Sequence, residues 1–145
     1  MLRRQPAGVV VVTVDAGGAR LGLTVATLVS LSFEPPLVGI AVARQAALHE
    51  LLREAGGFAV SLLAAGQESL AQHFARGVPP IALWQGVAVR DGARGPLLEG
   101  AVGWLACGLA AEHATGDHTF FVGAVEHAEA GAAAAPLLRI GGEYA

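Results

Sequence analysis

The amino-acid sequence predicts a mainly β protein, an antiparallel barrel with a few short helices, as a single domain over residues 1–145. Three observations support this class. Apolar, often β-branched runs alternate with Gly and Pro turns, only two segments have the spacing of an amphipathic helix, and no repeat or interdomain linker interrupts the chain. A parallel arrangement would need a helix between successive strands, so an antiparallel one is favoured.

The expected strands are short, and most end at a Gly or Pro. The first is followed by Asp15–Ala19, whose paired glycines permit the positive φ of a tight hairpin turn. A third segment is dense in Thr, Ser and Val, which favours extended structure, and Pro35-Pro36 ends it. The strands are expected at 8–14, from Arg20 onward, 24–32, 37–42, 58–63, 87–90, 101–112, 119–125 and 137–140.

Two helices are expected, over 46–54 and 67–75, because their apolar residues recur on one face. Gly56-Gly57 ends the first and Gly77 closes the second. Residues 76–100 are rich in Gly and Pro and predict a long excursion over the surface. The alanine tract 128–135 is interpreted as a variable turn between the last strands.

The composition is unusually apolar for a small domain. It has 54% hydrophobic and 14% charged residues with a mean hydropathy of +0.55. A free monomer of this kind would expose a large apolar patch, so we expect a homodimer. The net charge is −3 without a basic stripe, so neither nucleic acid nor an anionic membrane is an expected partner. The absence of lysine rules out Schiff-base and phosphate-loop lysine chemistry.

The compartment is inferred from the cysteine count and the N-terminus. Cys107 is the single cysteine, so no internal disulfide can form, and its apolar surroundings predict a core residue. The apolar run after Met1–Arg4 stops at Asp15 without a cleavage pattern, and no run approaches the roughly 18 residues of a membrane span. We expect a soluble, cytoplasmic protein.

Common catalytic motifs are missing. The glycines of residues 17–22 lack the dinucleotide-loop spacing, no serine lies in a nucleophile elbow, and the five histidines lack recognised ligand spacing, so no metal site is expected. Two features remain: the hydroxyl-rich segment Thr24–Ser32 and the turn Gly116-Asp117-His118 before an aromatic strand. On composition alone, a run of Thr and Ser in a strand more often reflects the polarity of an edge strand than a binding site.

Several sequence pieces occur in a recognisable order between Gly8 and Tyr144. They are G-V-V-V-V-T, G-L-T-V-A-T-L-V-S-L-S-F-E-P-P-L-V, F-A-V-S-L-L-A-A-G-Q-E-S-L-A-Q-H-F-A, G-P-L-L-E-G-A-V-G-W-L-A-C, G-D-H-T-F-F-V-G-A-V and P-L-L-R-I-G-G-E-Y. Together they resemble the flavin reductase-like family of FMN-binding split barrels, which includes reductase components of two-component flavin monooxygenases. The resemblance implies an antiparallel Greek-key split β-barrel that forms a homodimer.

The resemblance also implies where a flavin would bind. The segment 22–32 would surround the isoalloxazine ring, which assigns Thr24, Val25, Ala26, Thr27, Ser30, Leu31 and Ser32 to the cofactor site. Ala26 stands where many relatives have Asn, so one amide is lost. Arg44 is kept from the family's phosphate motif, whereas Ala46, Leu48 and Ala71 replace hydroxyl residues. A buried phosphate needs donors, and the candidates are Arg44, His49, His73 and Arg76.

His118 matches the family histidine that meets the nicotinamide, and it is the predicted catalytic residue. The alternative interpretation is that His118 is an ordinary turn residue capped by Asp117. Hydride transfer needs two rings held face to face and no dedicated protein acid or base, which fits the lack of a catalytic dyad. The expected function is FMN reduction by NADH or NADPH, with FAD possible and a monooxygenase as recipient of reduced flavin. The alternatives are a non-catalytic flavoprotein or electron carrier, and a barrel that has lost flavin.

Overall fold

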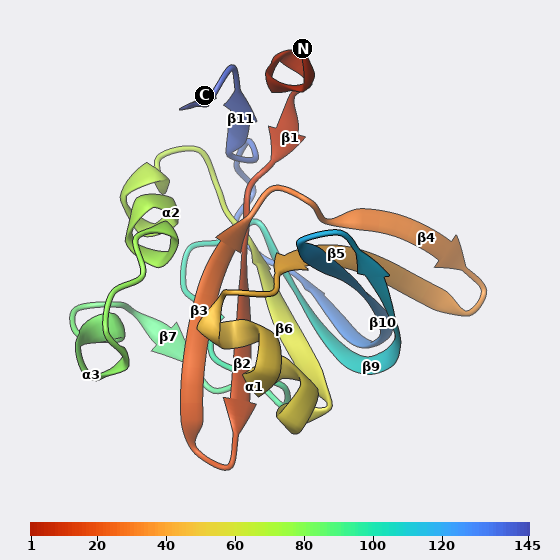
Figure 1. Cartoon of the computed structure of the whole chain (residues 1–145). Helices are drawn as coiled ribbons and strands as arrows, with labels where there is room; N and C mark the ends of the chain where they lie inside the picture. The colour runs from red at the N-terminus through yellow and green to blue at the C-terminus, as the bar shows by residue number, and fades with distance from the viewer.

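The computed structural model describes all 145 residues, and it confirms a mainly β protein with few helices (Figure 1). Its main sheet has seven strands in the order β3-β2-β6-β9-β10-β5-β4, and every pair in it is antiparallel. The bounds are β2 Val10–Ala16, β3 Ala19–Val25, β4 Val29–Phe33, β5 Pro36–Ala43, β6 Gly57–Leu62, β9 Gly103–Thr115 and β10 His118–Ala130.

The strand order interleaves early and late segments of the chain. β9 and β10 form a long hairpin that lies between β6 and β5, so the C-terminal half fills the middle of the sheet. β3 and β4 stand at the two edges and do not pair with each other. A second sheet joins β1 Ala7–Gly8 to β11 Leu138–Ile140 and β12 Glu143–Tyr144, which brings the two termini together, and β7 Val89–Arg90 pairs with β8 Leu97–Leu98.

Helix α1 (Ala47–Ala55) covers the main core. Leu48 and Leu52 of this helix pack with Val12, Phe58 and Phe121 of the sheet, all at most 2% exposed. Cys107 belongs to the same core, as predicted, and burial raises the pKa of its thiol to about 12. The helix ends at Gly56, whose left-handed backbone (φ 71°) has no steric cost for glycine.

Helix α2 (Glu68–Ala75) and the short α3 (Pro80–Leu83) lie beside β3 over a second core (Figure 1). Both predicted amphipathic helices are confirmed, whereas α3 and the 3-10 turn η1 (Leu2–Arg4) were not expected. The longest helix, α1, has nine residues, which is too short for a membrane span.

Two sequence predictions were wrong in detail. Residues 24–32 are not one extended segment, because the chain turns between β3 and β4, where the Thr27 hydroxyl bonds to both the N–H and the C=O of Ala41 at 3.1 Å. The alanine tract is not only a turn. Its first residues, Ala128–Ala130, continue β10, because pairing with β9 supplies hydrogen bonds that a local pattern does not reveal.

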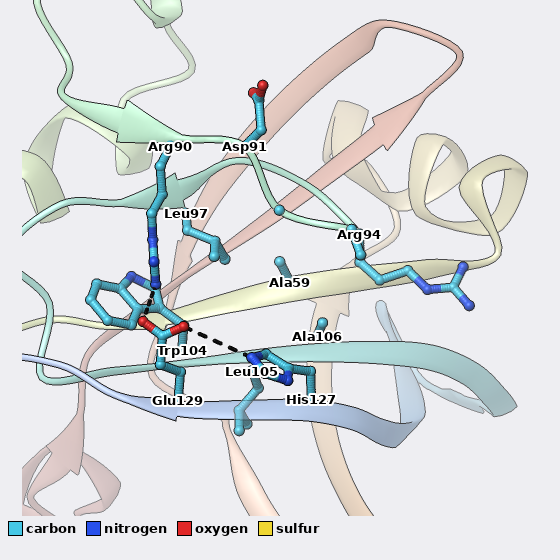
Figure 2. Close-up of a pocket in the computed structure, with 12 residues that line it drawn as sticks. Ala59, Arg90, Asp91, Arg94, Leu97, Trp104, Leu105, Ala106, His127 and Glu129 are labelled. Carbon is cyan, nitrogen blue, oxygen red and sulfur yellow. Dashed lines mark hydrogen bonds and ion pairs between the residues drawn. The ribbon is translucent and has the colours of Figure 1, made fainter.

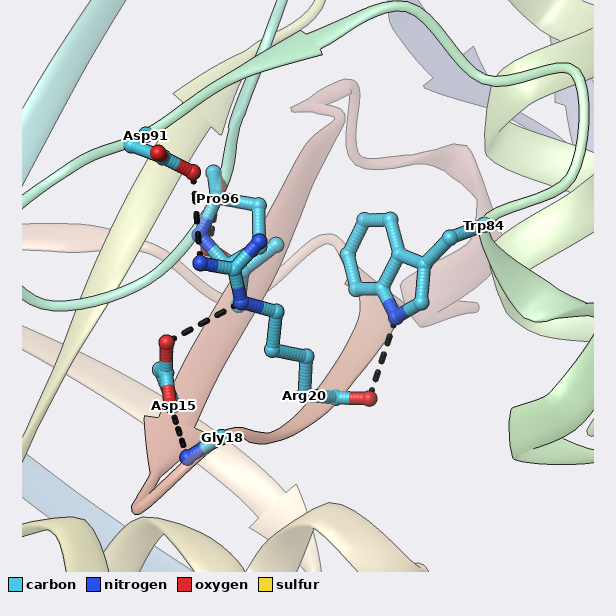
Figure 3. A network of polar contacts seen from close by, with 7 residues as sticks. Asp15, Gly18, Arg20, Trp84, Asp91 and Pro96 are labelled. Atoms are coloured by element: carbon cyan, nitrogen blue, oxygen red, sulfur yellow. Dashed lines mark hydrogen bonds and ion pairs between the residues drawn. The ribbon is translucent and has the colours of Figure 1, made fainter.

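The predicted excursion 76–100 is tied to the β2–β3 hairpin by polar contacts (Figure 3). Arg20 lies between Asp15, at 3.0 Å, and Asp91, at 3.2 Å, while its carbonyl accepts from the Trp84 indole N–H at 3.1 Å. The hydrogen bond from the Gly18 N–H, and to a smaller extent the one from Arg20, lowers the pKa of Asp15. The buried Thr13 hydroxyl adds a 2.6 Å bond to the Pro96 carbonyl. These contacts hold the excursion against the sheet.

Candidate functional site

One end of the main sheet brings Arg44, Asp117 and His118 together. The backbone N–H of Arg44, just after β5, donates to the Asp117 carbonyl in the β9–β10 turn at 3.0 Å. His118 begins β10 and pairs with Ala43, the last residue of β5. Residues more than 70 positions apart in sequence therefore become neighbours, because β5 and β10 are adjacent strands.

The ring of His118 is oriented by its neighbour. Its Nδ1 lies 2.7 Å from Oδ1 of Asp117, and this hydrogen bond, helped by the charge of Arg44, lowers the pKa of Asp117. An ionised carboxylate only accepts, so Nδ1 carries the proton of this bond. The His118 side chain remains 42% exposed, and its Nε2 has no partner within the chain. The second ring nitrogen is thus available to a ligand.

The predicted ring segment is divided between two strands and the turn that joins them. Thr24 and Val25 end β3, Ala26 and Thr27 lie in the turn, and the others lie in β4. Two of the hydroxyls are already used: Thr24 donates to the Ala71 carbonyl of α2 at 2.7 Å, and Thr27 bonds to Ala41. The hydroxyls of Ser30 and Ser32 make no hydrogen bond within the chain. Register with β5 shifts between these two serines, at Leu31.

The two histidines predicted to bind phosphate are engaged inside the protein. His49 is only 6% exposed, its Nε2 lies 2.7 Å from the Thr119 hydroxyl, and its ring packs on Phe121. His73 is half-buried on α2, with Nε2 2.6 Å from the Leu83 carbonyl. In each histidine Nε2 is therefore already in contact with a group of the protein, and the cofactor role of both residues stays a prediction.

A cleft of about 290 Å³ lies between β3, the start of α1 and the end of α2. Its lining includes Ala46 and Leu48, two positions where hydroxyls were expected from the resemblance. No charged side chain lines it, and the single polar side chain is that of Gln45. The first turn of α1 has no side-chain cap, because residue 46 is alanine. Its N–H groups are donors that a local side chain does not satisfy.

A second cavity, of about 210 Å³, lies where residues 90–97 cross β6, β9 and β10 (Figure 2). Arg90 stacks on Trp104, with its guanidinium carbon 4.3 Å from the ring centroid, and pairs with Glu129. Arg94 points away from the cavity and binds Glu126 through two hydrogen bonds, of 2.9 and 2.8 Å. Each arginine there already has its own carboxylate. These pairs were not anticipated, since no sequence signal links partners more than 30 residues apart.

The chain is an antiparallel β domain in which Arg44, Asp117 and His118 gather where β5 ends and β10 begins. The chain belongs to the flavin reductase like domain family, whose model matches residues 2–145. It is 42% identical over 137 residues to the reductase component of 4-hydroxyphenylacetate 3-monooxygenase from Thermus thermophilus, covering 94% of this chain and 86% of that relative.

Two further relatives agree. An NADH:FMN oxidoreductase of Rhodococcus erythropolis is 39% identical, with 99% of this chain and 77% of the relative covered. The solved structure of the NADH:FAD oxidoreductase of Streptomyces globisporus in complex with NAD and FAD fragments superposes with a TM-score of 0.93 at 38% identity, covering 99% of this chain and 87% of that one. The family predicted from the sequence pieces is confirmed.

Proposed function

We propose that this chain is an NAD(P)H:flavin oxidoreductase that binds FMN, with FAD as an alternative flavin, and supplies reduced flavin to a separate monooxygenase. The observation that carries the proposal is the meeting of Arg44, Asp117 and His118 at one end of the sheet, in a chain that matches the flavin reductase family over residues 2–145. The flavin, when bound, supplies the hydride acceptor.

The residues present fit the polar edge of a flavin ring. The free hydroxyls of Ser30 and Ser32 are donors to ring oxygens and nitrogens, whereas Thr24 and Thr27 fix the backbone on either side of the turn that precedes β4. We assign ring binding to the segment Thr24–Ser32, including the backbone at Val25, Ala26 and Leu31. Because the hydroxyls of Thr24 and Thr27 already hold the backbone, the segment is preorganised for the ring, which lowers the entropic cost of binding.

We assign the flavin phosphate to Arg44. Its guanidinium forms no ion pair with a carboxylate, unlike Arg20, Arg53, Arg90 and Arg94. The uncapped N–H groups of α1 begin three residues further on, at Ala47, and suit an anion as well. The adjacent cleft lacks charged side chains, so Arg44 and these amides replace the hydroxyls that Ala46 and Leu48 do not provide.

We assign the nicotinamide to His118. Asp117 fixes the ring orientation through Nδ1, so Nε2 presents a constant direction to the bound nucleotide. The role is positioning, because a hydride moves between two rings without a protein proton donor. A rigid neighbour is useful here, since a displacement of about 1 Å can cost on the order of 100-fold in rate.

We propose a homodimeric split barrel in which β4 forms part of the subunit contact. Figure 1 shows the β4–β5 hairpin extending away from the rest of the sheet, and β4 is an edge strand that pairs only with β5. Its apolar side chains are open to solvent: Val29 is 42%, Leu31 45% and Phe33 89% exposed. An exposed apolar edge is unfavourable unless it is covered. Light scattering decides the point, and a monodisperse monomer at micromolar concentration would contradict it.

The function is tested on purified protein loaded with FMN. Under anaerobic conditions, NADH or NADPH should bleach the yellow flavin absorbance within the mixing time of a cuvette experiment. A yellow protein that does not bleach would identify an electron carrier or flavin-binding module. A protein that stays colourless and does not quench the fluorescence of added FMN would identify a barrel without flavin.

A further inference from the structure

A third cavity, of about 440 Å³, lies where the two termini meet. It is lined by η1, β1, the turn after β3 and the C-terminal strands, through Leu2, Arg3, Gln5, Ala7, Ala26, Arg139 and Gly142. Figure 1 shows the N- and C-terminal segments side by side at this end of the molecule, above the sheet. The lining is mixed and includes two guanidinium groups and one side-chain amide, whereas no charged side chain lines the cleft beside α1.

The two arginines are held in place without an anion. The Nη2 of Arg3 donates to the Gly141 carbonyl at 3.3 Å, while the Gly141 N–H bonds to the Arg3 carbonyl at 2.6 Å. The Arg139 guanidinium lies over the Tyr144 ring, 5.5 Å from its centroid. Neither arginine forms an ion pair, although the cavity beside Trp104 shows that this chain pairs its arginines where carboxylates are near.

Gly142 keeps the position of Arg3 open. A Cβ at residue 142 would overlap the Nη2 atom of Arg3, so the glycine leaves the space that the guanidinium occupies. The arginine is thus fixed by contacts that are neutral and leave its charge uncompensated. Two guanidinium groups without an ion pair line one cavity, which suits an anionic ligand with several oxygen atoms.

We propose that this cavity binds the diphosphate group of a nucleotide through Arg3 and Arg139. Guanidinium groups match phosphate oxygens bidentately, and a volume of about 440 Å³ accommodates a diphosphate with part of its ribose. Ala26 lines the same cavity and also belongs to the segment assigned to the flavin ring, so a ligand can reach from one to the other. The identity of the nucleotide rests on the proposed function: it is NADH, whose diphosphate joins its two halves.

Binding is measured by calorimetry on the flavin-loaded protein with inorganic pyrophosphate and with ADP-ribose, which carries the diphosphate but no nicotinamide. Arg3→Gln and Arg139→Gln should each weaken both ligands by about 10-fold to 100-fold, the loss of one charge-assisted hydrogen bond. Arg4→Gln is the matched control, because it removes the same charge from the same 3-10 turn without lining the cavity. It should change neither affinity by more than about twofold.

Kinetics separate this site from the flavin site. In both cavity variants the KM for NADH should rise with an unchanged limiting rate of flavin reduction, while reduced nicotinamide mononucleotide, which lacks the diphosphate, is used as by the wild type. If FAD competes with ADP-ribose and FMN does not, the diphosphate of the flavin is the ligand instead.

The calorimetric arm does not depend on turnover, so a protein that reduces no flavin can still bind pyrophosphate. Absence of pyrophosphate and ADP-ribose binding by the wild type, or equal weakening by Arg4→Gln, would overturn the proposal. Circular dichroism melts check that each variant folds. Arg3→Gln alone decides the matter if Arg139→Gln loses the contact with Tyr144 and unfolds.

Discussion

Replacing Arg44 by alanine tests how the flavin phosphate is held. The Arg44 backbone N–H keeps its bond to the Asp117 carbonyl in the variant, and the side chain has no ion pair to lose, so the melting temperature should stay the same. The expected loss is confined to the ligand. One hydrogen bond from a charged donor contributes about 1.5–3 kcal/mol, so the Kd for FMN should rise about 10-fold to 150-fold.

The assay is fluorescence quenching of each flavin on titration with protein. Riboflavin lacks the phosphate, so its Kd should be nearly the same for the wild type and the Arg44→Ala variant. Arg4→Ala serves as the control for net charge, because Arg4 is exposed on η1 and lies outside the site. Equal losses for FMN and riboflavin would refute the reasoning, since they would place Arg44 at the ring or in the fold. An unchanged FMN affinity would move the phosphate elsewhere.

Three further outcomes follow from the structure. His118→Ala should leave the flavin spectrum and FMN affinity unchanged but slow anaerobic reduction in stopped flow by on the order of 100-fold; unchanged reduction kinetics would leave His118 as a turn residue. Gly123→Ala should lower the free energy of urea unfolding by about 1–3 kcal/mol, because its Cβ would lie 2.7 Å from Cζ of the buried Phe58; an unaltered midpoint would show that the core can yield. The folded-state pKa of Asp15 is lowered by the Gly18 N–H and Arg20, so its contribution to stability is present above its ordinary value of 3.8 and is lost as the pH falls through the lower folded value. The difference in unfolding free energy between wild type and Asp15→Asn should therefore begin to shrink as the pH falls below about 4 and vanish once the pH is below the lowered folded pKa, and a difference that persists there would mean that another interaction is involved.

Much of the architecture was accessible from local patterns. The hairpin at Asp15–Ala19, both amphipathic helices and the core position of Cys107 follow from glycine placement and apolar spacing, and all are present. These features depend on interactions within a few residues, where the backbone preferences of glycine and the helical period act directly. The family could also be predicted from the sequence, because the order of several short motifs carries more information than any one motif.

Other features exist only because distant strands meet. The segment 24–32 breaks where the Thr27 hydroxyl bonds to Ala41, and β10 continues into the alanine tract because β9 runs beside it. A local pattern does not contain these partners. A backbone group takes whichever hydrogen-bond partner the assembled sheet supplies.

The candidate site divides in the same way. From the sequence and its resemblance to the family, Arg44, the serines of β4 and His118 are predicted as site residues. The contact of Asp117 with His118, the enclosure of His49 against Thr119 and the cavity shared by Arg3 and Arg139 appear only in the folded structure. The physical reason is that a side chain's role depends on its burial and its polar partners, and both are set by the packing of elements far apart in the chain.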